Sequence, residues 1–494
     1  MIKNIFLIIL LLTAVSKTYA QCDTLILSLN DAIVRAADSS LQALMSYNNF
    51  LAAYWQHRSF KSEKLPFINV STNPLYFSRT FTREFNFADT SYYFVEQRLL
   101  NSDINISINQ SIPLTGGQIY IDAAIDRLQN LKNKSFTQYS TTPLRIGLNQ
   151  QLFGYNKYKW SNKIEPLKYE KAQKDLIKNI EDISLNTVAY YFKFIKASIN
   201  LELAKKYLNN ADTLLKISIK KYEIASISRE DLYTIQLQFI NKESEYKNAI
   251  IEYKNARTQL LSFLRLSENI EIKPVIPKVI HNTSIDQEKA ITLFKENNPD
   301  LLNLEIQRLE SLSNVEKIKK ESRFYSNLNA SFGLNQTAGN FSETFKNPTD
   351  QEIIRVSLSI PILDWGNARG KYNLTKKQHE ALLALLEQNK IDLLQTVKLA
   401  VEKFNLQKEL VFKSRLADSL ARETYEITLK RYINGQSDII RLLNSQASAI
   451  EAQRNYINAL EQYWYYYYFL RKLTLYDLIQ DREIEKDYII KILN

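Results

Sequence analysis

Four long segments of the chain repeat apolar residues every three or four positions, which is the pattern of an amphipathic helix. They cover residues 155–221, 229–265, 366–431 and 438–474. A helix of about 65 residues would be about 100 Å long, which is more than one globular core can bury. We therefore expect each long helix to form an antiparallel hairpin with the shorter helix that follows it. Residues 31–62 and 286–322 are also helical in pattern and are available to pair with the remaining length.

Shorter segments alternate apolar and polar residues, so that one face is apolar and the other polar. The segments that show this strand pattern are 65–70, 104–114, 118–128, 145–153, 327–334 and 354–363. One apolar face fits either the core of a soluble sandwich or a membrane barrel with lipid outside and water inside. The attachment of these strands to very long helices favours the barrel, because a sandwich gives such helices no reason to continue from its strands.

The chain is a tandem duplication. A shift of 210 positions places residues 211–260 on 421–470 with 12 identities in 50 positions, where unrelated segments would share about three or four. Upstream, an offset of 260 places Asn69 on Asn329. The first repeat therefore carries an insertion, about 72–144. We expect this insertion to add a hairpin with a tight turn at Gly116-Gly117 on one side of the membrane and long polar loops on the other.

The amino terminus reads as a secretory signal, with Lys3, an apolar run from Ile5 to Val15 and the small residue Ala20 before the cut. Cys22 raises a lipid anchor as an alternative, although Gln21 stands where lipoprotein signals carry a small residue. No later stretch reaches the ~20 apolar residues of a membrane-spanning helix. We divide the chain into a signal peptide (1–20), a first repeat (21–270), a linker (271–285), a second repeat (286–480) and a C-terminal tail (481–494).

Composition gives little support to catalysis or to nucleic-acid binding. The net charge of +11 is spread as lysines among glutamates on the helical segments, with no basic arm. His57, His281 and His379 are isolated from one another and from metal ligands at suitable spacing, so we interpret them as ordinary surface histidines. We expect no enzyme activity, no cofactor and no metal.

The breaks between paired helices carry recognisable capping residues. At the first break, Ser228 and Asp231 have the spacing of a capping box. At the second, Gly435 suits the left-handed end of a helix, and Ser437 or Asp438 would cap the next one. Two interpretations are open. These residues only make a tight turn, or they place charges in a ring where the tips of several copies of the chain meet around a symmetry axis. The charged neighbours are Arg229, Glu230, Asp231, Asp438 and Arg441.

The first break resembles the helical-hairpin tip of the TolC family of outer-membrane efflux channels, with Tyr222, a small residue at Ala225, then Ser228, Asp231 and Gln236. Tyr432 and Gly435 repeat the pattern. The segment that contains Pro361, Asp364 and Gly366 is similar to the strand-to-helix junction of that family's second repeat.

The resemblance implies long helical hairpins that form a periplasmic α-barrel, together with strands given to a shared trimeric β-barrel in the outer membrane. It also implies a homotrimer that contacts outer-membrane lipid and docks on a periplasmic adaptor and an inner-membrane transporter. Three copies would supply about 12 strands, or about 18 if the inserted hairpin joins the barrel. The expected function is the exit duct of a tripartite efflux system. The alternatives are the exit duct of a type I protein-secretion system and a periplasmic coiled-coil scaffold or adaptor.

Two positions depart from the family pattern. Arg441 stands where the family commonly has an acidic residue, so an anionic constriction ring does not carry over, and Ala225 replaces a glycine. We expect the constriction at residues 225–234 and 435–444.

Two aromatic runs, Tyr190–Phe192 and Tyr463–Phe469, allow two interpretations. They are either a membrane-interface belt or packing between long helices. Their position inside helical segments favours packing.

Overall fold

The computed structural model describes residues 24–86, 90–131, 136–279 and 284–484. The expected signal peptide, Cys22, His281 and most of the expected tail lie outside these residues. The chain forms two compact units, each built from both repeats. The first contains the residues up to Phe50, Gln173–Pro299 and those from Asp392 onward, and the second contains Leu51–Ala172 and Asp300–Ile391.

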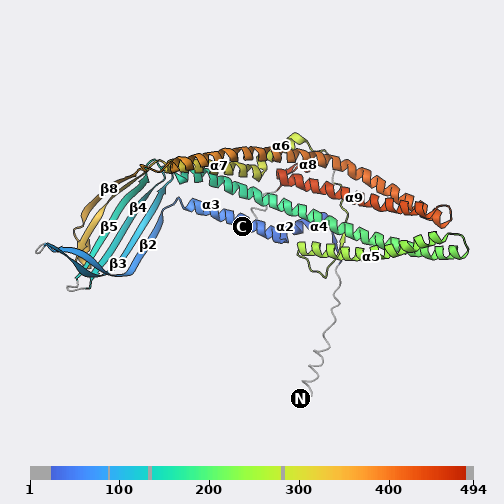
Figure 1. The fold of residues 1–494 in the computed structure, drawn as a ribbon, viewed down its shortest axis with the longest axis horizontal. Helices are drawn as coiled ribbons and strands as arrows, with labels where there is room; N and C mark the ends of the chain where they lie inside the picture. Colours follow the sequence, from blue (N-terminus) through green and yellow to red (C-terminus); the bar gives the residue numbers. More distant parts are fainter. Residues whose placement is uncertain (1–23, 87–89, 132–135, 280–283, 485–494) are drawn as a thin grey trace, which may run out of the picture. The chain divides into compact units, whose positions relative to one another are not determined.

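The long helices agree closely with the sequence pattern (Figure 1). Both α4 and α8 have 67 residues, and their starts, at 157 and 367, differ by the offset of the duplication. Residues 31–62 and 286–322 are helical as expected, but each segment contains two helices, because Ser40 and Asn298 have extended backbones. Pro299 explains the second break, since a residue before proline avoids the helical conformation. The helices are α2 Leu29–Ser39, α3 Leu41–Ser62, α4 Lys157–Glu223, α5 Arg229–Phe263, α6 Gln287–Asn297, α7 Pro299–Glu321, α8 Asn367–Ile433 and α9 Ile439–Thr474.

Six antiparallel strands of the second unit form one sheet in the order β2-β3-β4-β5-β7-β8 (Figure 1). The inserted hairpin supplies β3 and β4, so it joins the sheet rather than lying outside it. Two expectations are wrong. Residues 360–363 lie beyond the last strand. The residues expected to form long polar loops belong mostly to strands, because β2 runs to Asn86, β3 begins at Ser91, β4 runs to Asn130 and β5 begins at Phe136. The strands are β2 Phe67–Asn86, β3 Ser91–Ile112, β4 Gly117–Asn130, β5 Phe136–Gln151, β7 Tyr325–Ala338 and β8 Thr349–Ser359, with a short 3₁₀ turn, η1 Phe341–Phe345, before β8.

The register gives the sheet two different faces. Residues paired directly across antiparallel strands lie on the same face, and Ile68, Ile108, Ile121, Ile146 and Phe332 form one such row across five strands. This apolar face stays exposed, with its side chains open to the surroundings. The opposite face is polar and carries a bidentate ion pair, in which Arg145 Nη2 lies 2.6 Å and Nε 3.0 Å from the two oxygens of Asp122.

The helical part of the second unit packs around Trp160, whose indole N–H donates to Glu316 Oε2 at 2.9 Å. The interpretation of His57 and His379 as ordinary surface residues is wrong, because both are half-buried in specific contacts. The His57 ring stacks on Tyr169 with centroids 4.6 Å apart. His379 Nδ1 lies 2.9 Å from Ser311 Oγ.

The core of the first unit is rich in tyrosine. The Tyr191 hydroxyl lies 2.7 Å from the Leu27 carbonyl and 2.8 Å from the Val275 carbonyl, which ties α4 to the small parallel pair β1 Thr24–Leu27 and β6 Glu271–Pro274. In α9, Tyr463 and Tyr467 are buried. The second aromatic run therefore packs between helices, as its helical position favoured.

The C-terminal segment closes this core with a buried ionic cluster. The Arg471 guanidinium donates to Glu181 Oε1 at 2.8 Å and to Asp477 Oδ2 at 3.2 Å, and the Tyr467 hydroxyl donates to Asp477 Oδ2 at 2.6 Å. The side chains of both carboxylates are at most 3% exposed. Burial acts to lower the pKa of Arg471, but the neighbouring Glu181 carboxylate outweighs it and the pKa is raised. The segment continues as the small hairpin β9 Tyr476–Asp477 and β10 Arg482–Glu483.

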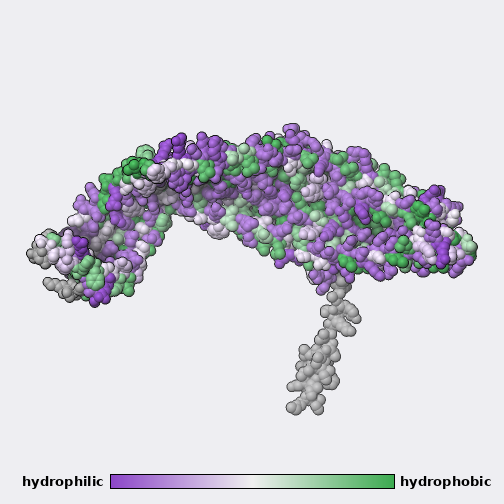
Figure 2. Space-filling view, viewed as in Figure 1, coloured by the Kyte–Doolittle hydropathy of each residue, from purple (hydrophilic) through white to green (hydrophobic). Residues whose placement is uncertain are grey.

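The surface of the helices is largely hydrophilic, with hydrophobic residues scattered over it in the view of Figure 2. Among the described residues, none of the helices combines the length and the apolar composition needed to cross a membrane.

Candidate functional site

The first tip connects α4 to α5 through a left-handed residue and a capping box. The N–H of Ala225 donates to the Tyr222 carbonyl at 2.9 Å and that of Ser226 to the Lys221 carbonyl at 2.8 Å, which is the Schellman arrangement of a helix C-terminus. Ala225 has φ 56°, a conformation that an alanine side chain disfavours. Ser228 and Asp231 exchange the hydrogen bonds of a capping box, as their spacing predicted.

The second tip repeats this geometry with a glycine. Gly435 has φ 75°, and its N–H donates to the Tyr432 carbonyl at 3.0 Å. Asp438 is the residue that caps α9, because its Oδ1 accepts the backbone N–H of Arg441 at 2.7 Å. Ser437 does not cap the helix, since its hydroxyl is buried with no hydrogen-bond partner among the described residues.

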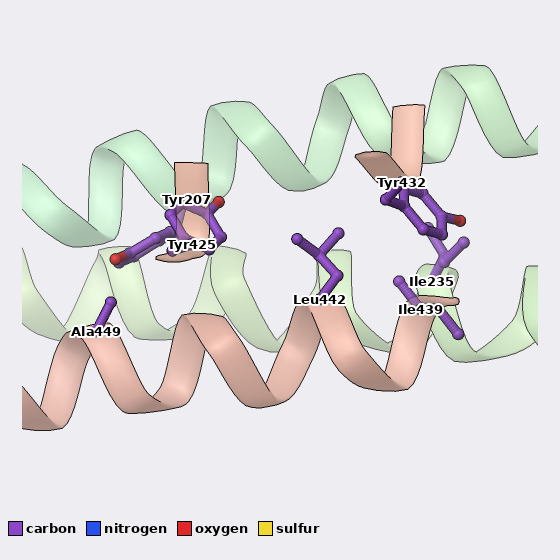
Figure 3. Close-up of a cluster of buried hydrophobic side chains, with 7 residues drawn as sticks. All are labelled: Tyr207, Ile235, Tyr425, Tyr432, Ile439, Leu442 and Ala449. Carbon is purple, nitrogen blue, oxygen red and sulfur yellow. The ribbon is translucent and has the colours of Figure 1, made fainter. Parts of the chain in front are cut away.

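A buried cluster holds the two hairpins together just behind the tips (Figure 3). The Tyr207 and Tyr425 rings meet edge to face with centroids 5.6 Å apart, and the Tyr425 hydroxyl accepts the Asn210 amide at 2.9 Å. Burial raises the pKa of Tyr207 to about 12. Of the two matching tip tyrosines, Tyr432 belongs to this cluster whereas Tyr222 is exposed. The cluster consists of Tyr207, Ile235, Tyr425, Tyr432, Ile439, Leu442 and Ala449.

The charged residues of the tips face solvent. Within one chain Arg441 Nε lies 3.9 Å from Asp438 Oδ2, and the two side chains are 72% and 60% exposed. The Arg229 guanidinium lies 5.4 Å from the Tyr233 ring centroid, and Glu230 is exposed. An ion pair as open as Asp438–Arg441 contributes about 0–1 kcal/mol. The exposed tip charges are therefore available to other molecules, while Asp438 already caps α9 and Asp231 is the acidic partner of the Ser228 cap.

The strand-to-helix junction of the second repeat is a capped turn. Asp364 accepts the N–H of Gly366 at 2.9 Å and of Ala368 at 2.8 Å, and these hydrogen bonds, that from Ala368 first, hold the pKa of its carboxyl below the usual value. Gly366 has φ 83° and Trp365 φ 54°. Pro361 directly precedes this turn and is exposed. Two successive left-handed residues explain why the helix starts abruptly here.

The matching junction of the first repeat uses a residue that the sequence pattern did not single out. Asn156 caps α4 by accepting the N–H of Lys159 at 3.1 Å, and its amide donates to the carbonyls of Pro113 and Leu114 at 3.0 Å. Asn156 thus ties the turn of the inserted hairpin to the start of α4. Asn156 is far from Pro113 and Leu114 in the sequence, so no local sequence pattern predicts this contact.

Among the described residues, no group of three or more histidine, cysteine, aspartate or glutamate side chains is placed to hold a metal ion. The tips and junctions of the described chain therefore consist of helix caps, exposed charges and apolar packing. These features suit the assembly and movement of helices.

Comparison with known proteins gives a match to a family model over part of the chain and a fold over nearly all of it. Residues 290–474 match the model of the family described as outer membrane efflux protein, whereas no curated protein matches the chain. Among solved structures, the chain is similar to the CmeC outer membrane channel of Campylobacter jejuni, with TM-score 0.65 and 15% identity over 94% of this chain and 88% of that one. It is also similar to VceC of Vibrio cholerae, with TM-score 0.63 and 12% identity over 92% and 97%. For MtrE of Neisseria gonorrhoeae in its open state, the TM-score is 0.58 and the identity 15% over 96% and 97%.

These matches confirm the resemblance to the outer-membrane efflux channels and the expected fold class. The expected location agrees with the printed description of the family that matches residues 290–474, outer membrane efflux protein.

Proposed function

We propose that this chain, whose residues 290–474 match the model of the outer membrane efflux protein family, is the exit duct of a tripartite efflux system. It would carry substrates passively across the outer membrane, without bond chemistry. The observation that carries this proposal is a six-stranded sheet with one exposed apolar face and one polar face, joined to two long helical hairpins. Lipid on the apolar side and water on the polar side would satisfy both faces.

The edges of the sheet support assembly from several copies. Within the described chain β2 and β8 each pair on one side only, and lipid does not tolerate an open strand edge. If β2 of one copy pairs with β8 of the next, three copies close a barrel of about 18 strands, within the range of outer-membrane barrels.

The helices present a second set of unpartnered surfaces. On α8, Leu399, Leu406, Leu420 and Ile427 are exposed and lie seven or fourteen residues apart, the spacing of a coiled-coil seam. Such a seam requires a companion helix along its length. A neighbouring copy in a homotrimer would supply it, so the sheet edges and the helices point to the same assembly.

The helical tips are the proposed constriction, at residues 225–234 and 435–444. In a trimer their exposed charges would meet near the symmetry axis, and opposite charges at ~4 to 6 Å attract by about 3 to 4 kcal/mol at an effective dielectric near 20, before desolvation. Solvent exposure reduces each pair to about 1 kcal/mol or less. Several symmetric pairs would then hold a closed state that a periplasmic adaptor, linked to an inner-membrane transporter, can open by sliding the packed helices.

Conductance in planar lipid bilayers tests the duct directly. We expect the purified full-length protein to insert and give discrete current steps. The scaffold alternative predicts a protein that stays in solution without detergent and gives no steps. That second result would end the proposal of a duct.

The gate is tested separately with Asp438→Ser combined with Arg441→Gln. Serine also caps helices, so this variant removes the charges and keeps the turn. We expect a higher conductance than wild type, with Lys377→Gln combined with Glu380→Gln, an exposed ion pair on α8, as the charge-matched control. Unchanged conductance in a normally assembled variant would mean that these residues only cap a turn.

A further inference from the structure

Strands β2 and β3 continue beyond the rest of the sheet as a two-stranded ribbon. The last residue of β4, Asn130, pairs with Leu99, whereas the β2–β3 pairing continues from Arg79↔Arg98 to Asn86↔Ser91. Figure 1 shows these two strands running past the end of β4. An isolated two-stranded ribbon is marginally stable in water, so its exposed side chains require an explanation.

One face of this ribbon interleaves arginine with aromatic residues. Every second residue of a strand lies on the same face. On β3, Leu100, Arg98, Glu96, Phe94 and Tyr92 therefore lie on the face of Ile104, which is the apolar face of the sheet. Phe81, Tyr92 and Phe94 are exposed on it. In cross-strand pairs, the face reads Phe77↔Leu100, Arg79↔Arg98, Phe81↔Glu96, Arg83↔Phe94 and Phe85↔Tyr92.

This face has an excess of positive charge. Arg79 and Arg98 face each other across the strands, a like-charge pair that destabilises a sheet, and both contact the single carboxylate of Glu96. The Arg83 guanidinium lies 3.8 Å from the Tyr92 ring centroid, and Arg127 lies on the same face of β4. In this part of the described sheet, this face therefore carries four guanidinium groups and one carboxylate. Folding alone does not explain the excess, whereas an anionic partner would.

The position of the arginines follows from the length of the apolar band. On β3 the band runs from Ile108 to Leu100, and at about 3.4 Å per residue with a tilt of about 40° it rises about 20 Å. The lipid-facing band of an outer-membrane barrel is about 25 Å tall. The facing pair Arg79 and Arg98 therefore begins where hydrocarbon gives way to headgroups.

We propose that Arg79, Arg83, Arg98 and Arg127 bind anionic, phosphate-bearing lipid headgroups of the outer leaflet, an inference that rests on the membrane barrel proposed above. Guanidinium groups bind phosphate in a bidentate geometry, and the interleaved aromatic rings suit the boundary between lipid and water. The headgroups neutralise the excess charge and anchor a ribbon that lacks a third strand.

The test titrates detergent-solubilised protein with bisphosphorylated lipid A, with the same lipid after removal of its phosphates, and with phosphatidylcholine, and counts bound lipid by native mass spectrometry. The variant combines Arg79→Gln, Arg83→Gln and Arg98→Gln. A control combines Lys216→Gln, Lys377→Gln and Lys413→Gln, three exposed helix residues. Conductance is measured on the same samples.

We expect wild type and the lysine control to bind bisphosphorylated lipid A, and the arginine variant to bind it at least about tenfold more weakly. Equal binding by the arginine variant would overturn the inference, and so would wild-type binding of dephosphorylated lipid A or of phosphatidylcholine at the same affinity. Conductance separates the lipid-binding proposal from the duct proposal. An arginine variant that conducts normally but fails to bind lipid A supports both. A wild-type protein that forms no channel contradicts the duct itself.

Discussion

Arg471 offers the sharpest test of how the first unit is held together, because one cation neutralises two buried carboxylates from distant parts of the chain. Arg471→Met keeps the aliphatic stem and removes the charge. Asp477 would keep the Tyr467 hydroxyl and the N–H groups of Ile479 and Gln480. Glu181 would lose its guanidinium partner, and its Oε2 already has no hydrogen-bond partner among the described residues.

The expected loss of stability follows from this difference between the two carboxylates, because only Asp477 keeps other hydrogen-bond donors. Removing one partner of a buried ion pair costs about 3 to 5 kcal/mol, and we expect about 3 kcal/mol because Asp477 remains hydrogen-bonded. At about 2 to 4 °C per kcal/mol, the melting temperature should fall by about 6 to 12 °C. Thermal unfolding followed by tryptophan fluorescence in detergent measures the shift.

Two further variants make this prediction refutable. Arg471→Met with Glu181→Leu removes both ends of the contact, and we expect it to recover at least half of the loss, since apolar replacements of buried ion pairs are often neutral. Lys472→Met breaks the neighbouring, more exposed contact with Asp182 and should cost about 1 kcal/mol or less. An unchanged melting temperature for Arg471→Met, or a double variant as unstable as the sum of its single changes, would refute the reasoning.

The remaining predictions concern the tips, the helical seam and the junction. Ala225→Gly should stabilise the first hairpin by about 1 kcal/mol and Gly435→Ala should destabilise the second by a similar amount, because both positions are left-handed; equal melting temperatures would contradict this. Leu406→Glu with Leu420→Glu should shift the assembled protein toward single chains on size-exclusion chromatography, while Lys398→Glu, exposed on α8 outside this heptad register, should not; intact assembly of the leucine variant would exclude this seam as an interface. The cap at Asp364 has a lowered native pKa, so its contribution is present above the unfolded value of about 3.9 and is lost as pH falls through the lower native value; Asp364→Asn should lack this part of the acid dependence of unfolding.

The long helices could be predicted to within a few residues because their apolar periodicity runs far and their ends carry ordinary signals, such as Ser228 and Gly435. The caps at Asp231 and Asp438 followed from the same local rules. Local rules decide such features because the partners lie within a few residues of each other in the chain.

The strand ends and the ionic cluster could not be predicted from the sequence in this way. The ribbon of β2 alternates phenylalanine with arginine on one face, so hydrophobic alternation fails there although the strand continues. Glu181 and Arg471 are separated by 290 positions, and Asn156 reaches a turn that the insertion carries. The left-handed conformation of Ala225 could not be predicted for another reason, because alanine disfavours positive φ and its presence does not indicate such a conformation.

The central claim is that no single chain closes its own membrane sheet, so that several copies share one barrel. The mass of the detergent-solubilised particle, with bound detergent subtracted, tests this most directly. The account predicts three polypeptides per particle, because six strands from each copy close a barrel of about 18. A monodisperse particle with the mass of one chain would contradict it.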